Sequence, residues 1–427
     1  MKKTLIITYY WPPAGGPGVQ RWLKFVKYLR DFEVDPVVYI PENPDYPFKD
    51  ESFLGEVPED ITVLRHPIFE PYALASVFSK KKSQQLSSGI ISEKKQSFTE
   101  RLLLWIRGNF FIPDARKFWV KPSVRFLSTY LKENNIDTII TTGPPHSVHL
   151  IGMQLKEKCG VRWISDFRDP WTTIGYHKRL KLTGSSRRKH KQLEREVLRN
   201  SDQIVVTSKT TKKEFEAITQ QPIEVITNGY DRHGGRATEP DKLFSLSHIG
   251  SLLSGRNPEI LWQSLSELTR EREDFKKDLE LKLAGVVSED ILKSIEAQGL
   301  KPYLNMPGYL SHEDALKMQR SARLLLLIEI NSKETECIIP GKLFEYMVAG
   351  RPILAIGPEN WDVRDILKDT NTGVSFSYEQ KTELKEKIVS CYEDYKRGAL
   401  ESHPIGLQQY SRKSLTQKLA SIIHKGS

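Results

Sequence analysis

The chain has 427 residues, more than a single hydrophobic core usually serves, so we expect two domains of about 200 residues each. Its formal net charge of +10 indicates an anionic partner such as a nucleotide or an acidic membrane surface, and the lack of a helix-turn-helix, RNA-binding or zinc motif argues against nucleic acid. The three cysteines are widely spaced and lack CxxC spacing, and no apolar stretch approaches the ~20 residues of a membrane span. These features predict a cytoplasmic protein.

Short β-rich apolar segments alternate with helix-like amphipathic segments in the first half of the chain. The strand-like segments are residues 4–9, 36–40, 61–64, 138–142, 162–165, 204–207 and 224–227. This alternation predicts β/α units around a parallel sheet, within a first domain that spans residues 1–235. Residues 69–99 interrupt the pattern, because they have little apolar periodicity and include three consecutive lysines, and we expect them to form a mobile insertion.

A second series of the same kind follows a linker, which we place within residues 228–241 because they are rich in glycine and charged residues. Strand-like segments at 243–249, 279–284, 324–328 and 353–356 alternate with helix-like segments at 258–272, 312–321 and 342–348. This predicts a second doubly wound α/β domain over residues 236–407. We expect the last helix, within residues 408–427, to pack back on the first domain.

The first strand leads into the run YYWPPAGGPG, residues 9–18, and then into a helix. Glycines such as Gly15 and Gly16 at this point allow a ligand to approach the backbone, and the free N–H groups of a helix start favour an anion. The alternative is a plain Gly/Pro turn. The run lacks GxGxxG spacing, which argues against a nicotinamide dehydrogenase.

The segment DFRDPW, residues 166–171, ends a predicted strand with two carboxylates, an arginine and an aromatic residue. Ligands bind at the carboxyl ends of the strands in open α/β sheets, so Asp166, Arg168 and Asp169 are candidate site residues. The alternative is a local ion pair between Arg168 and Asp169 beside a packed turn.

At the start of the second domain, a predicted strand ends at Gly250 and a helix follows shortly after Arg256. Arg256 would then lie beside the helix-start amides, where both stabilise a diphosphate. The alternative is a surface arginine near a helix cap.

The run PGKLFEY, residues 340–346, begins a helix after a Pro/Gly break. Lys342 and Glu345 are three residues apart and share one helix face, with Gly341 just before them. A lysine suits a phosphate, and a carboxylate suits ribose hydroxyls. The alternative is an ion pair on the helix surface, which is worth only about 0.2–0.5 kcal/mol.

Together these four segments resemble the family-four retaining glycosyltransferases, in particular a bacterial branch with YYWPP-x-GG near the N-terminus, DFRDPW, and P-x-K-x-x-EY in the donor domain. The resemblance covers nearly the whole chain, with the motifs in the right order. It implies a GT-B fold, in which two Rossmann-like domains face each other across a cleft. It also implies transfer of a sugar from a nucleotide-diphosphate donor, with retained anomeric configuration, no catalytic metal and no other cofactor.

For the first domain, the resemblance implies that Gly15 and Gly16 lie by the donor phosphate and acceptor. Asp169 would face the acceptor or the sugar. Asp166 and Arg168 would lie on the acceptor side.

For the second domain, the resemblance implies that Arg256 and Lys342 neutralise the diphosphate and that Glu345 holds the ribose. Gly250 and Gly341 would belong to the same donor site. The main catalytic task would be stabilisation of the leaving diphosphate, and no nucleophilic carboxylate can be assigned.

Two departures from the family pattern concern donor contacts. The usual partner glutamate of Glu345 would stand at position 337, which is Cys337, while Glu336 is one position away. The family also often has an arginine just after the first glycine of the donor domain, where this chain has Ser251.

Two other activities stay open on the same fold: a nucleotide-sugar 2-epimerase, which needs no acceptor, and a catalytically silent nucleotide-sugar-binding protein. For the transferase, family analogy suggests a saccharide or lipid-linked acceptor in bacterial surface polysaccharide assembly. The donor base, the sugar and the oligomeric state are not determined by the sequence.

Residues 98–120 mix apolar and basic side chains, which suits weak peripheral binding to an anionic membrane surface at the inner face. The alternative is packing against a protein core. The apolar residues are Leu102, Leu103, Trp105, Ile106, Phe110, Phe111, Phe118 and Trp119, and the basic ones are Arg101, Arg107, Arg116 and Lys117.

Overall fold

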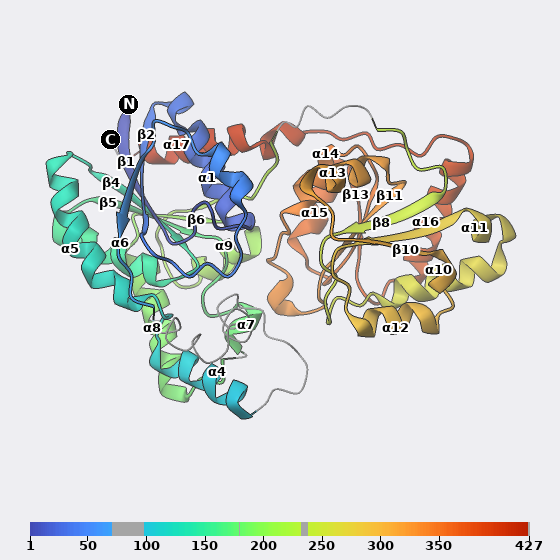
Figure 1. Cartoon of the computed structure of the whole chain (residues 1–427), viewed down its shortest axis with the longest axis horizontal. Coiled ribbons are helices and arrows are strands. Elements are labelled where there is room, and N and C mark those ends of the chain that lie inside the picture. Colours follow the sequence, from blue (N-terminus) through green and yellow to red (C-terminus); the bar gives the residue numbers. More distant parts are fainter. Residues whose placement is uncertain (71–97, 179, 232–237, 426–427) are drawn as a thin grey trace. The chain divides into compact units, whose positions relative to one another are not determined.

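The computed structural model describes residues 1–70, 98–178, 180–231 and 238–425. The chain forms two compact units: unit 1 comprises Met1–Asn228 together with Arg412–Ser427, and unit 2 comprises Gly229–Ser411 (Figure 1). The predicted insertion at 69–99 falls almost wholly outside the described residues, as does the middle of the predicted linker.

Unit 1 contains a parallel sheet whose seven strands, counted over its described residues, run in the order β3-β2-β1-β4-β5-β6-β7. The central strands are buried nearly along their whole length, which matches their apolar and β-branched sequences. The strands are β1 (Lys2–Thr8), β2 (Val34–Pro41), β3 (Thr62–His66), β4 (Thr138–Gly143), β5 (Arg162–Phe167), β6 (Gln203–Val206) and β7 (Ile223–Val225).

The helices of unit 1 begin at recognisable local signals. Gly16, with a φ of 104°, precedes α1, whose first position is a proline, and the side chains of Thr183 and Ser208 cap α8 and α9. The helices are α1 (Pro17–Leu29), α4 (Phe98–Phe110), α5 (Lys117–Glu133), α6 (Ser147–Cys159), α7 (Gly175–Lys178), α8 (Gly184–Asn200), α9 (Lys209–Glu216) and α17 (Arg412–His424).

Helix α17 follows all of unit 2 in sequence but belongs to the core of unit 1. Its apolar face, which includes Leu415, Leu419 and Ile423, is buried in that core and packs beside α1. Arg162 at the start of β5 donates hydrogen bonds to the carbonyls of Ile422 and Ile423 near the helix end, at 3.0 and 3.2 Å. The last helix therefore completes the first unit.

Unit 2 contains a second parallel sheet, with six strands among its described residues in the order β10-β9-β8-β11-β12-β13. The strands are β8 (Phe244–Ile249), β9 (Leu279–Ala284), β10 (Leu304–Gly308), β11 (Leu324–Ile328), β12 (Ile353–Ile356) and β13 (Gly373–Phe376). The helices are α10 (Glu259–Glu271), α11 (Glu273–Asp278), α12 (Glu289–Ala297), α13 (His312–Ser321), α14 (Lys342–Val348), α15 (Asp362–Thr370) and α16 (Lys381–Lys396).

Apolar clusters lie on both faces of the unit 2 sheet, so its strands are covered by helices on each side. In both sheets, strands are added outward in one direction and then in the other from the first strand of the unit. Each unit is therefore a doubly wound, Rossmann-like α/β fold, which confirms the predicted fold class. No helix within the described ranges is long and apolar enough to cross a membrane.

Candidate functional site

The strand order of each sheet reverses at one point, between β1 and β4 in unit 1 and between β8 and β11 in unit 2. Ligands of open α/β sheets bind outside the carboxyl ends of the strands at such a point. The glycine-rich run follows β1, and Gly250 follows β8. Two of the motifs identified in the sequence therefore lie at the two switch points.

The glycines after β1 are required by the local packing of unit 1. A Cβ atom on Gly15 would lie 2.3 Å from the ring of Phe48, and one on Gly18 would lie 1.8 Å from Nη1 of Arg168. A Cβ atom on Gly16 would meet no atom within 4 Å, but its φ of 104° is one that residues with a side chain rarely adopt. The placement of Gly15 and Gly16 beside a donor phosphate stays a prediction.

Arg168 connects the glycine-rich turn to the end of β4. Its Nε donates to the carbonyl of Gly143 at 3.1 Å, its Nη2 donates to the carbonyl of Pro144, and its guanidinium carbon lies 6.0 Å from the ring centre of Tyr10. Since Gly18 leaves space for Nη1, the guanidinium reaches the start of α1. The structure thus brings two sequence motifs together at one edge of the sheet.

Asp166 is enclosed within unit 1. Its side chain is 1% exposed, and it accepts hydrogen bonds from Arg21 Nη2 at 2.9 Å and from Trp22 Nε1 and Thr142 Oγ1 at 2.8 Å. Burial alone raises the pKa of Asp166, but the charge of Arg21 and these hydrogen bonds outweigh it and lower that pKa. The acceptor-side role expected for Asp166 does not fit this geometry, because its carboxylate is already fully engaged by the protein.

Asp169 differs from Asp166 in having no internal partner. It is half-buried just after β5, and within the described residues it neither accepts a hydrogen bond nor forms an ion pair. Burial raises the pKa of its carboxyl group, and Arg168 opposes that shift. Its proposed position facing an acceptor or sugar is therefore still open to a ligand, and stays a prediction.

His146, between β4 and α6, was not identified from the sequence. Its ring stacks on Trp171 at 4.8 Å and is 5% exposed, and within the described residues neither ring nitrogen has a hydrogen-bond partner. Burial, followed by the neighbouring His149, lowers the pKa of His146 well below its usual value, so the imidazole is neutral. The run GPPH directly after the predicted strand 138–142 was the sequence signal for it.

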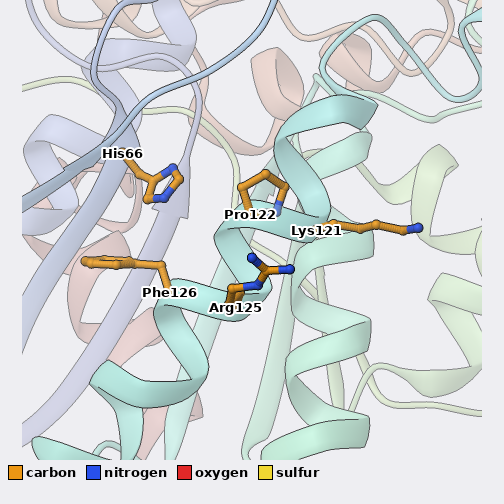
Figure 2. Close-up of a pocket in the computed structure, with 5 residues that line it drawn as sticks. All are labelled: His66, Lys121, Pro122, Arg125 and Phe126. Carbon is orange, nitrogen blue, oxygen red and sulfur yellow. The ribbon is translucent and has the colours of Figure 1, made fainter.

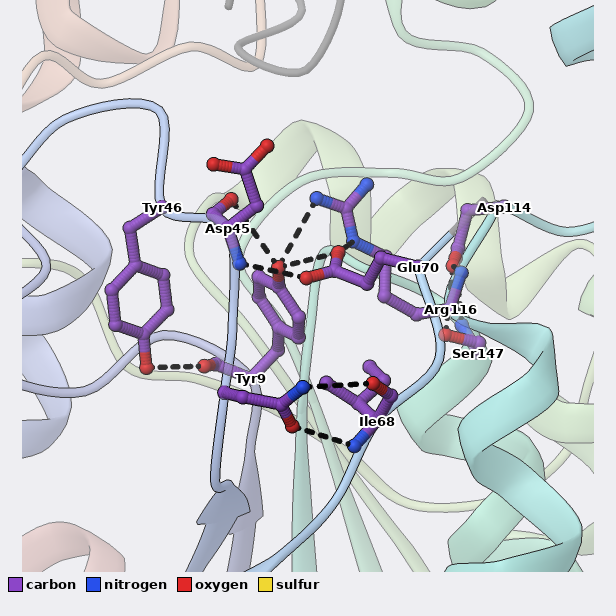
Figure 3. A network of polar contacts seen from close by, with 9 residues as sticks. Tyr9, Asp45, Tyr46, Ile68, Glu70, Asp114, Arg116 and Ser147 are labelled. Carbon is purple, nitrogen blue, oxygen red and sulfur yellow. Dashed lines mark hydrogen bonds and ion pairs between the residues drawn. The ribbon is translucent and has the colours of Figure 1, made fainter. Parts of the chain in front are cut away.

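A buried polar network fixes the segments around the end of β1 (Figure 3). Glu70 accepts from the hydroxyl of Tyr9 at 2.7 Å and from the backbone N–H of Asp45 at 2.7 Å, and it pairs with Arg116 at 3.1 Å. Asp114 accepts from the N–H of Ser147 at 2.9 Å and so holds the start of α6. Arg116, which was expected among the membrane-facing cations, is therefore internal, and Trp119 is buried as well.

In unit 2, Gly250 and Lys342 approach each other closely. A Cβ atom on Gly250 would lie 2.8 Å from Lys342 Nζ, and Gly250 has a φ of 117°. Lys342 Nζ also lies 3.3 Å from Nε2 of His248, whose Nδ1 lies 3.0 Å from the carbonyl of Leu326. The carbonyl can only accept, so Nδ1 carries the proton and the lone pair of Nε2 accepts from the lysine.

Burial disfavours the charged form of Lys342. The loss of solvation lowers the pKa of Lys342 from 10.5 to about 8, and the positive charge of Arg256 lowers it further, while Glu329 and Glu345 oppose this shift. The pKa of His248 is also lowered well below its usual value, first by burial and then by Lys342, so the imidazole is neutral. The lysine is therefore a cation that an anionic ligand would stabilise.

Arg256 is held by a carboxylate that sequence reasoning missed. Glu329 follows β11 directly, and its Oε1 and Oε2 accept from Nε and Nη2 of Arg256 at 2.9 and 3.3 Å. The glutamate side chain is 2% exposed, whereas that of the arginine is 31% exposed. The sequence signal was the first charged residue after an apolar strand, at the same sheet edge as Gly250.

The remaining predicted donor residues lie around α14. Gly341 directly precedes this helix, and Glu345 is half-buried and accepts from Nε2 of Gln319 at 3.1 Å. Cys337, at the position of the glutamate usual in the family, is buried, and its Sγ lies 3.7 Å from the carbonyl of Glu334. The ribose-binding role of Glu345 stays a prediction.

A pocket of about 410 Å³ lies on unit 1 (Figure 2). It is lined by His66 at the end of β3 and by Lys121, Pro122, Arg125 and Phe126 of α5. None of the residues identified from the sequence lines it. No three His, Cys, Asp or Glu side chains within the described ranges are arranged to hold a metal ion.

Two family models match the chain, one on each side of the linker. Residues 90–233 match the model described as Glycosyltransferase Family 4, and residues 244–394 match the model described as Glycosyl transferases group 1. No curated protein matches the chain in sequence.

Solved structures with the same overall fold include several sugar-transferring enzymes. The Anabaena protein HepE, crystallised with UDP and glucose, is 13% identical with a TM-score of 0.58, and 100% of each chain is covered. WaaG, a glycosyltransferase involved in lipopolysaccharide biosynthesis, is 14% identical with a TM-score of 0.55, and 99% of each chain is covered.

A variant of S. aureus TarM, crystallised with α-GlcNAc-glycerol and UDP, is 11% identical with a TM-score of 0.59, covering 99% of this chain and 100% of its own. At these identities the likeness establishes the fold. Residues 90–233 and 244–394 thus match two glycosyltransferase family models, and the two Rossmann-like units have the GT-B fold of the solved structures.

Proposed function

We propose that the chain transfers a sugar from a nucleotide-diphosphate donor, with retention of anomeric configuration, to a saccharide or lipid-linked acceptor. The observation that carries this proposal is the pair of cations, Arg256 and Lys342, at the switch point of the group 1 domain. Lys342 is half-buried beside Gly250, and the side chain of Arg256 is 31% exposed. This chemistry suits a diphosphate that approaches the backbone.

Leaving-group stabilisation is the central step of the proposed mechanism. When the bond between the sugar and the β-phosphate breaks, negative charge grows on the nucleoside diphosphate. Arg256 and Lys342 meet this charge with N–H donors that the protein already holds in place, and no metal is required in that role. Glu345 binds the ribose, and Gly250 and Gly341 leave room for the phosphates.

Unit 1 contributes polar groups for the other substrate. Among the described residues, the carboxylate of Asp169 has no hydrogen-bond or ion-pair partner, and neither ring nitrogen of His146, at the end of the neighbouring strand, has one. We propose that they bind hydroxyl groups of the acceptor or the donor sugar, since a neutral imidazole and a carboxylate both suit hydroxyls. Arg168 positions this edge through its bonds to two carbonyls.

We further propose that the acceptor belongs to bacterial surface polysaccharide assembly at the inner face of the membrane. The exposed side chains of α4 and of the α5 start support weak peripheral binding, because they combine apolar groups with cations. The exposed apolar residues are Leu102, Leu103, Trp105, Phe110 and Phe118. Neighbours such as WaaG act in lipopolysaccharide biosynthesis, which supports the same setting.

The test is incubation of the full chain with a panel of nucleotide sugars, with and without saccharide and lipid-linked acceptors, followed by mass analysis. We expect acceptor-dependent transfer that EDTA does not abolish. An isomeric nucleotide sugar formed without acceptor would instead identify a 2-epimerase. Binding without donor hydrolysis or transfer would identify a silent binding protein, and a strict need for added Mg²⁺ or Mn²⁺ would contradict the role given to the two cations.

A further inference from the structure

We propose that Glu329 is a positioning residue, which holds the side edge of the Arg256 guanidinium so that its end edge faces a diphosphate. The inference rests on the proposed function, because it assigns how Arg256 meets the donor. Glu329 was not part of any motif identified in the sequence.

The geometry of the ion pair determines which N–H groups remain available. A guanidinium has five N–H donors in a fixed plane. Nε and Nη2 of Arg256 are directed to Glu329 at 2.9 and 3.3 Å, which uses the side edge of the plane. Nη1 donates to no residue in the described part of the chain, so the end edge, formed by Nη1 and the second N–H of Nη2, can bind a phosphate in a bidentate manner.

The carboxylate is fixed more firmly than the arginine that it holds. Glu329 Oε1 also accepts from the N–H of Ile330 at 2.9 Å, the backbone N–H of Glu329 donates to Ile356 at 2.9 Å, and Tyr378 donates to the Glu329 carbonyl at 2.8 Å. Arg256 instead stands on a loop between β8 and α10. The buried carboxylate therefore sets the orientation of the guanidinium.

The surrounding charges explain why the arginine does not simply move to the ligand. Glu329 is almost fully buried, so a departing Arg256 would leave an unpaired carboxylate in a poorly solvated place. Lys342 is already engaged with His248. The arrangement of lower energy keeps the ion pair and adds the phosphate at the free edge. The guanidinium of Arg256 then binds the carboxylate of Glu329 along one edge and the phosphate along another.

The test compares E329Q with R256A and with the double variant R256A/E329Q in the full chain. Turnover and KM are measured with the donor found active, and affinity is measured calorimetrically with inorganic pyrophosphate and with UDP. We expect R256A to lower kcat/KM by about a hundredfold. E329Q should lower it about tenfold, mostly in kcat, because a misaligned donor costs more in the transition state than in the ground state.

The double variant carries the decisive comparison. If Glu329 acts through Arg256, R256A should have much less effect in the E329Q background than in the native chain. Equal effects in both backgrounds would overturn the inference. Tighter pyrophosphate binding by E329Q with unchanged kcat would also overturn it, because Glu329 would then act only as a repelling charge.

Two further variants separate this result from a folding defect and from a failure of the proposed function. R256K keeps the charge but has no second edge, so it should be nearly as impaired as R256A, and native kcat/KM in R256K would contradict the two-edge arrangement. E393Q, which removes the glutamate partner of Arg272 elsewhere in unit 2, is the control of equal charge and should behave as the native chain. A native chain without transfer or pyrophosphate binding would overturn the proposed function together with the inference, whereas a defect in R256A alone would overturn only the role of Glu329.

Discussion

In each unit, an arginine forms an ion pair with a buried carboxylate at the carboxyl ends of the strands. The two pairs differ in the exposure of the arginine. In unit 1, Arg21 and Asp166 are each 1% exposed. In unit 2, Glu329 is 2% exposed, whereas Arg256 is 31% exposed. Both pairs include close N–H to oxygen contacts, so hydrogen bonding alone does not distinguish them.

The difference lies in what the guanidinium does with its remaining donors. Nη1 of Arg21 donates to the carbonyl of Thr227 at 2.7 Å, which ties α1 to the segment after β7. Nη1 of Arg256 donates to no described residue, and the side chain as a whole is 31% exposed. We infer that the fully buried, or sealed, pair of Arg21 and Asp166 stabilises the fold of unit 1. The partly exposed, or open, pair of Arg256 and Glu329 keeps N–H donors available for a ligand.

The largest effect is expected from D166N. The substitution leaves Arg21 as an unpaired buried cation, which should reduce the free energy of unfolding of unit 1 by about 3–5 kcal/mol. Urea denaturation of the full chain, followed by fluorescence, measures the loss, with E329Q as the matched change in unit 2. A D166N variant with native stability but no transfer activity would contradict the structural role of Asp166 and would instead support a role in substrate binding.

The second prediction concerns pH and Lys342. Its pKa is lowered to about 8, so the lysine is a cation below that pH and loses its charge as the pH rises through it. The association constant for UDP should therefore be highest below pH 8. Above pH 8 it should fall by about tenfold, which corresponds to about 1.4 kcal/mol. Calorimetric titrations on both sides of this pH measure the change.

K342R is the matched control for that profile, because arginine stays charged throughout the range. Its UDP affinity should be independent of pH over the same interval. A native chain whose affinity does not change through pH 8 would remove Lys342 from the phosphate site.

The smallest effect is expected at the surface of α4 and α5, where the cations have water around them. Full chain should sediment weakly with vesicles that contain anionic lipid and less so as salt rises, since each cation near the surface contributes about 1 kcal/mol. F118S should reduce the bound fraction severalfold, and I405S, at an exposed residue of unit 2, should not. No binding at any anionic content would remove the membrane proposal and leave the transferase proposal intact.

The sequence predicted the buried strands well and missed two edge strands. β9, β11 and β12 have the predicted bounds, because each is a continuous apolar or alternating run. β10 and β13 were not predicted. They lie at the two edges of the unit 2 sheet and are mostly half-buried or exposed, and each has only two alternating apolar side chains, too short a pattern to indicate a strand.

The candidate site was predictable only for residues whose place beside a predicted strand or helix start indicates their role. Arg256 and Lys342 could be proposed from their place after a strand and at a helix start. Their neighbour Glu329 is 73 residues from Arg256, and Asp166 is 145 residues from Arg21, so no local pattern distinguishes the open pair from the sealed one. The exposure of each arginine depends on helices and loops that meet only in the folded unit.

The place of α17 in unit 1 has a consequence for synthesis on the ribosome. All strands of unit 2 emerge before Arg412, so that unit can close its own core while unit 1 still lacks Leu415, Leu419 and Ile423. The first unit to be translated is thus the second to be completed, and until then its α1 face is apolar and uncovered. A nascent chain stalled before Arg412 should accordingly need chaperone binding at unit 1, although every strand of that unit has already been made.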